Sequence, residues 1–125
     1  MELDHLDHLV LTTQNLKACL HFYVDLLGMK AVEKAGRYAL CFGSQKINIH
    51  TVKGEFQPAA QYPTYGSLDF CLIAKGDIHT IRQELLDKGA PLITDIVPRN
   101  GALGPMDSLY LRDPDGNLVE IAVYR

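Results

Sequence analysis

The apolar positions along the chain predict a strand, a helix and three further strands in the first half. Residues 6–12 alternate apolar and polar side chains and end in a threonine, as a half-buried strand does. Residues 15–27 carry leucines, a cysteine and a tyrosine at three- and four-residue spacing, and Gly28 follows where a helix C-cap is expected. Glycine-containing turns then separate three short predicted strands, at 30–34, 38–42 and 46–52.

The same order begins again after a proline-containing linker. Residues 67–74 read as a strand, and Asp77 is a favoured N-cap for a helix whose apolar stripe ends before Gly89. The stretch from Pro98 to Gly101 reads as a loop. Tight-turn residues at 113–116 (DPDG) join the last two of three further predicted strands, which lie at 91–97, 108–112 and 117–124.

Equivalent positions in the two rounds are 61 residues apart, which pairs His8 with Asp69 and Gly28 with Gly89. The chain therefore reads as β-α-β-β-β twice, an α+β class. Two modules of this length are each too short to bury a full core, so we expect them to combine into one sheet system within a single domain.

Composition and charge exclude several functional classes. With 47% hydrophobic residues, 22% charged residues and a net charge of −3, the chain is typical of a soluble globular protein. Lysines and arginines are scattered, which argues against nucleic acid as a partner. No apolar stretch approaches the roughly 20 residues of a membrane span, and no signal-peptide pattern opens the chain. Three widely spaced cysteines predict neither a disulfide framework nor a zinc knuckle, so we expect a reducing, cytoplasmic location.

Four polar residues interrupt the apolar pattern at similar places. The first and last strands of each module have one continuously apolar face, and the opposite face carries one group able to bind a metal. Taken singly, each group is more typical of a hydrogen-bonded or solvated strand residue. Their coincidence predicts a site for one divalent ion, zinc, nickel, iron or manganese, with an open position for substrate oxygens. The candidate ligands are His8, His50, Asp69 and Glu120.

Three segments carry a resemblance that covers essentially the whole chain. Residues 7–11 (DHLVL), 22–29 (FYVDLLGM) and 112–121 (RDPDGNLVEI) resemble the vicinal-oxygen-chelate superfamily, which contains glyoxalases, bleomycin-resistance proteins and dioxygenases. Residues 45–50 (QKINIH) and 66–72 (GSLDFCL) are most similar to its branch called glyoxalase domain-containing protein 5.

This resemblance implies a glyoxalase-like domain over residues 1–125, with modules at about 5–53 and 66–125 and a linker at about 54–65. The modules would form a cupped, mostly antiparallel sheet around one metal, with the helices on its outer face, often in a homodimer. Family ligands lie on the first and fourth strands of each module, which corresponds to the four candidates above. The chain departs from the family at Asp69, where many members have histidine, and at His50, where glutamate is frequent.

The resemblance favours a metal-dependent lyase or isomerase of the glyoxalase I type. It would act on a small vicinal dioxygen substrate such as a hemithioacetal, stabilising an enediolate, with Glu120 or Asp69 as the catalytic carboxylate that moves the proton. For Arg99, anion binding competes with the commoner role of a solvated surface arginine. Arg99 and Tyr110 are the candidate substrate-binding residues.

Two alternatives remain open. An iron(II) extradiol dioxygenase would use His8, His50 and Glu120 as its facial triad. A metal-free binding protein of the bleomycin-resistance type would instead hold an apolar or aromatic ligand against aromatic walls. The candidates for those walls are Phe56, Tyr62, Tyr65 and Tyr110.

Overall fold

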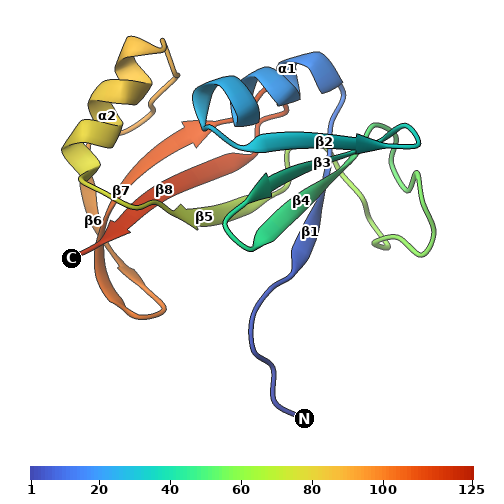
Figure 1. Cartoon of the computed structure of the whole chain (residues 1–125), viewed down its shortest axis with the longest axis horizontal. Coiled ribbons are helices and arrows are strands. Elements are labelled where there is room, and N and C mark those ends of the chain that lie inside the picture. The colour runs from blue at the N-terminus through green and yellow to red at the C-terminus, as the bar shows by residue number, and fades with distance from the viewer. The chain divides into compact units, whose positions relative to one another are not determined.

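A computed structural model describes all 125 residues and divides into two compact units, residues 1–66 and 67–125. Each unit contains one four-stranded sheet and its helical segment (Figure 1). Residues 1–7 precede the first strand as an exposed extended segment.

The first unit builds its sheet in the order β1-β4-β3-β2. Strands β1 and β4 are parallel neighbours, and the other two pairs are antiparallel. The predicted helix is continuous but changes from α-helical to π-helical hydrogen bonding after its fifth residue. The elements are β1 (His8–Thr12), α1 (Leu16–Leu20), η1 (His21–Leu26), β2 (Lys30–Lys34), β3 (Arg37–Phe42) and β4 (Gln45–His50).

The second unit repeats this topology, with sheet order β5-β8-β7-β6 and a parallel β5–β8 pair. Both remaining pairs are antiparallel. The predicted α+β class with two βαβββ modules is therefore confirmed. The elements are β5 (Asp69–Ile73), α2 (Ile78–Asp87), β6 (Val97–Gly101), β7 (Gly104–Arg112) and β8 (Leu118–Tyr124).

One predicted strand was placed wrongly. Of residues 91–97 only Val97 lies in a strand, and residues 91–96 make only an isolated bridge, between Leu92 and Leu111. The strand itself is β6, over the stretch that the sequence predicted to be a loop because it contains Pro98 and Gly101. Proline is tolerated there because β6 pairs on one side only, with β7, and an edge strand can leave one N–H position unused.

The apolar faces identified in the sequence form the core of each unit. In the first unit the buried strand residues are Leu11, Leu40, Ile47 and Ile49, and the helix adds Cys19, Phe22, Tyr23 and Leu26. In the second unit α2 contacts β7 and buries Ile78 and Leu85, while the strands bury Leu109, Leu111, Val119 and Ile121. Asp77 caps α2 as predicted, accepting a hydrogen bond from the Thr80 amide. None of the helices has the length and apolar character that a membrane-spanning segment requires.

A buried polar pair ties the last turn to β5. The side chain of Asp113 accepts hydrogen bonds from the backbone amide of Asn117 (2.9 Å) and from its side-chain Nδ2 (2.7 Å). Asn117 in turn accepts a hydrogen bond from the backbone amide of Leu68 (2.8 Å), directly before β5. Both polar side chains are buried. This pair fixes the start of β8 beside the start of β5 and so sets the position of Glu120 on β8.

We therefore expect Asn117→Ala to lower the free energy of unfolding by about 2–4 kcal/mol, because it removes two side-chain hydrogen bonds and leaves the part-buried Leu68 amide without its acceptor. Urea unfolding followed by circular dichroism measures the change. The exposed Asn100, on the edge strand β6, provides the matched control Asn100→Ala, which should change stability by under about 0.5 kcal/mol. Equal effects of the two substitutions would contradict the role given to Asn117.

Candidate functional site

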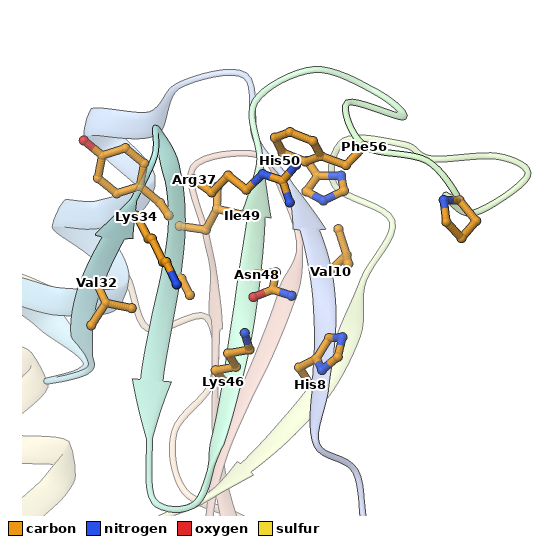
Figure 2. Close-up of a pocket in the computed structure, with 13 residues that line it drawn as sticks. His8, Val10, Val32, Lys34, Arg37, Lys46, Asn48, Ile49, His50 and Phe56 are labelled. Atoms are coloured by element: carbon orange, nitrogen blue, oxygen red, sulfur yellow. The ribbon is translucent and has the colours of Figure 1, made fainter.

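The open face of the first sheet carries a cavity of about 490 Å³ (Figure 2). Its lining follows the cross-strand rows of the sheet. At one end Lys34 pairs with Arg37, and His50 lies one residue beyond the Tyr38–Ile49 pair. At the other end His8 pairs with Lys46. Between the two ends lies a neutral row formed by Val10, Val32, Ala39 and Asn48.

The two histidines lie at opposite ends of this cavity (Figure 2). His8 pairs with Lys46, whereas Thr12 pairs with His50. Four residues of strand separate the two pairs, which is about 13 Å at roughly 3.3 Å per residue. Metal–nitrogen bonds are only about 2.0–2.1 Å long, and side chains stand roughly perpendicular to the sheet. His8 and His50 of one chain therefore do not bind the same ion.

The sheet registers also show that His50 is not the counterpart of Glu120. In the second unit Asp69 on β5 pairs with Leu118 on β8. Cys71, two residues further along β5, pairs with Glu120. In the first unit His8 on β1 pairs with Lys46 on β4, and the position two residues further along β4 is Asn48. Asn48 is therefore the counterpart of Glu120. The predicted repeat equivalence of His50 was wrong because alternation assigns a residue to a face but does not determine which residues pair across a parallel ladder.

His8 is held by an adjacent carboxylate. Its Nδ1 donates a hydrogen bond of 2.7 Å to Asp7, and this bond is the main reason that the pKa of Asp7 is lowered. The contact leaves Nε2 of His8 available as a ligand, the arrangement common among metal-binding histidines. His5 and His21 make the same kind of contact with Asp4 and Asp25, so the pair by itself is not specific for a metal site.

His50 belongs to an aromatic and cationic cluster. Its ring lies edge-on to Phe56, with 5.2 Å between ring centroids. The guanidinium of Arg37 lies 3.7 Å from the centroid of the same ring. Cation–π attraction and stacking hold Arg37 in one orientation at this end of the cavity.

On the second sheet, Glu120 is the candidate with the least satisfied side chain. Its Oε1 is buried and has no hydrogen-bond partner. Its cross-strand neighbours are Cys71 on β5 and Tyr110 on β7. Partial burial raises the pKa of the Cys71 thiol to about 11, with further contributions from the charge of Glu120 and a hydrogen bond to it. Asp69 is exposed, two residues before Cys71.

Arg99 and Tyr110, the predicted substrate-binding residues, contact each other. Nε of Arg99 donates a hydrogen bond of 3.0 Å to the Tyr110 hydroxyl, and the guanidinium lies 5.4 Å from the centre of the tyrosine ring. Tyr110 is also the strand neighbour of Glu120. Cys71, Glu120 and Tyr110 therefore form one cross-strand row. Arg99 pairs with Met106 outside this row and reaches the Tyr110 hydroxyl only through its long side chain.

The donor chemistry fits a divalent metal only in part. An imidazole from His8 and carboxylates from Asp69 and Glu120 suit zinc, nickel, iron or manganese, and the buried, unpartnered oxygen of Glu120 is a suitable donor. Neither unit contains three or more His, Cys, Asp or Glu side chains arranged to hold an ion. His50 lies at the opposite end of the first-sheet cavity from His8 and therefore does not complete this set.

Sequence reasoning missed the three cations that line the first cavity, Lys34, Arg37 and Lys46. A signal for them existed, because Lys34 alternates in phase with Val32, and Lys46 alternates in phase with His50. The predicted boundary of the third strand at residue 38, however, left Arg37 in a turn.

Comparisons with known proteins agree with this architecture. The family model described as Glyoxalase/Bleomycin resistance protein/Dioxygenase superfamily matches residues 5–121. Virulence protein STM3117 of Salmonella typhimurium is 46% identical over 125 residues, covering 99% of this chain and 87% of the relative. Its crystal structure superposes with a TM-score of 0.96 over 100% of both chains, at 44% identity.

Two further relatives are longer proteins. Glyoxalase domain-containing protein RDO1 of Mycosarcoma maydis is 43% identical over 121 residues, covering 96% of this chain and 68% of the relative. Biphenyl-2,3-diol 1,2-dioxygenase 3 of Rhodococcus globerulus is 34% identical over 125 residues, covering 94% of this chain and 62% of the relative. With a family match over nearly the whole sequence and the paired βαβββ fold, the chain belongs to the glyoxalase/bleomycin resistance protein/dioxygenase superfamily.

Proposed function

We propose that the protein is a metal-dependent lyase or isomerase acting on a small vicinal dioxygen compound of the hemithioacetal type. The candidate ligands are His8, Asp69 and Glu120, for one ion of nickel, zinc, iron or manganese. The observation that carries the proposal is the Oε1 atom of Glu120, which is buried and accepts no hydrogen bond, although the Cys71 thiol neighbours the same carboxylate. A buried carboxylate oxygen without a partner is costly, so such a group calls for a ligand or proton that the chain itself does not supply.

In this proposal the chain's residues bind and orient the substrate and move one proton. Glu120 accepts the proton from the carbon beside the substrate carbonyl and returns it to the neighbouring carbon. Tyr110, held by Arg99 and adjacent to Glu120 on β7, positions a substrate oxygen through its hydroxyl. A bound divalent ion would supply electrostatic stabilisation of the negative charge that develops on the two adjacent substrate oxygens.

The separation of His8 from His50 argues against the dioxygenase alternative. A facial triad needs two histidines and one carboxylate around one iron, and the two histidines of the expected triad are about 13 Å apart along the strands. Metal-free binding is the second candidate function, because the cavity of the first sheet combines Phe56 with cations and has no acidic lining residue. Members of the superfamily often form dimers, and we propose a homodimer for this chain as well.

Metal content tests the proposed ligands. Elemental analysis of the untagged wild-type protein should find about one divalent ion per chain, and His8→Ala and Glu120→Gln should each lower occupancy by roughly tenfold or more at limiting metal, since each removes a ligand. His50→Ala is the matched control and should retain the ion. Wild-type protein that binds no ion after incubation with nickel, zinc, iron or manganese would contradict the proposal and favour the metal-free binding protein.

Turnover of a hemithioacetal formed from methylglyoxal and a thiol tests the two carboxylates. Glu120→Gln should lower kcat by about 10²–10⁴-fold, the usual contribution of a general base, also when the metal is restored to full occupancy. Glu84→Gln, on the exposed side of α2, should leave kcat unchanged. A larger loss of kcat in Asp69→Asn than in Glu120→Gln, at equal metal occupancy, would transfer the role of the base to Asp69.

A further inference from the structure

We infer that the cavity on the first sheet binds an anionic group of an elongated organic ligand, with Lys34 and Arg37 as its binding residues. Only one part of this inference depends on the proposed function, namely that the bound anion is the substrate of the proposed reaction. The charged group then lies at the Lys34–Arg37 end of the cavity, and the reacting oxygens lie toward the His8 end (Figure 2).

The charged side chains that line the cavity are all positive. Lys34, Arg37 and Lys46 line it together with His8 and His50, and no aspartate or glutamate does. None of these three cations takes part in an ion pair. The nearby carboxylates of this unit are engaged elsewhere: Asp7 with His8, Glu33 with the Gly36 amide and Glu55 with the Thr51 amide.

The pairing of Lys34 with Arg37 points to a bound anion. The two residues are direct cross-strand neighbours on β2 and β3. Figure 2 shows the guanidinium of Arg37 beside Phe56 and His50, whereas the ammonium of Lys34 extends toward the middle of the cavity. An anion bound in this half of the cavity can therefore be attracted by both cations. The guanidinium of Arg37 is already held against Phe56 at 3.7 Å, so its planar donors lose little freedom when they bind a carboxylate, phosphate or sulfonate.

The side chains in the middle of the cavity indicate the chemistry of the uncharged part of the ligand. Val10, Val32 and Ala39 form an apolar floor, and Asn48 is the single uncharged polar side chain between them. The row of Lys34 and Arg37 lies about 13 Å from the row of His8, at roughly 3.3 Å per residue. The ligand class is therefore an elongated organic anion with an apolar body and its charge at the end remote from the reacting oxygens.

A pair of dyes separates the charge from the apolar body. The anionic probe is 8-anilinonaphthalene-1-sulfonate, and N-phenyl-1-naphthylamine presents the same rings without the sulfonate. Fluorescence titrations use the full-length wild-type protein, Arg37→Gln and Lys34→Gln, with Lys17→Gln as the control at an exposed lysine on α1 that does not line the cavity. Near-ultraviolet circular dichroism, which a molten globule loses, confirms that each variant is natively packed and so excludes dye binding to a molten state.

Arg37→Gln and Lys34→Gln should each weaken binding of the sulfonate by roughly tenfold to 150-fold, the range for loss of a hydrogen bond between charged groups. Binding of the neutral dye should be unchanged in both variants, and Lys17→Gln should match the wild type with either dye. Higher ionic strength should weaken binding of the sulfonate alone. Unchanged sulfonate affinity in both cavity variants, or equal losses for the two dyes, would overturn the inference.

The same variants separate this inference from the proposed metal function. His8→Ala should lose the ion while keeping the sulfonate affinity within about twofold of the wild-type value, and Arg37→Gln should keep the ion while losing the sulfonate. A wild-type protein that binds no metal would remove the lyase proposal and leave the dye result standing. Normal metal content together with sulfonate binding that does not depend on Lys34 and Arg37 would remove the anion site alone.

Discussion

Parallel pairing of the first and last strands in each half is the constraint on which the candidate chemistry depends. These ladders join β1 to β4 and β5 to β8, and they decide which polar side chains become neighbours on the open faces. In the second half the ladder places Glu120 beside Cys71, where partial desolvation and the carboxylate charge raise the thiol pKa to about 11. In the first half the same geometry places Lys46 beside His8.

The two open faces differ in charge as a result. Lysines, an arginine and two histidines line the cavity of the first sheet, whereas the candidate groups of the second sheet are the carboxylates Asp69 and Glu120. A cationic surface with an apolar floor suits the recognition of an anionic ligand, and a half-buried carboxylate suits proton transfer or metal binding. The two halves thus present different polar groups, because they share a backbone topology and not their polar residues.

Membership of the superfamily does not identify the activity, because one fold can carry many different functions and the side chains of the site decide among them. The aspartate at position 69 and the asparagine at position 48 occupy strand positions equivalent to His8 and Glu120. A ligand set drawn from His8, Asp69 and Glu120 therefore has one member fewer than the family resemblance implies.

The sequence by itself determined the fold class, the apolar faces, the cap at Asp77 and the alternation that places His8 and Glu120 opposite the apolar faces, because these follow from local periodicity and from residues near in the chain. It misplaced β6, since a proline forbids a central strand but not an edge strand, and edge position is a property of the whole sheet. The register of the parallel ladders was decided only in the tertiary structure, by pairing between strands more than thirty residues apart. That pairing separated His50 from His8, brought it to Arg37 and Phe56, and assembled a cationic cavity that no single segment of the chain contains.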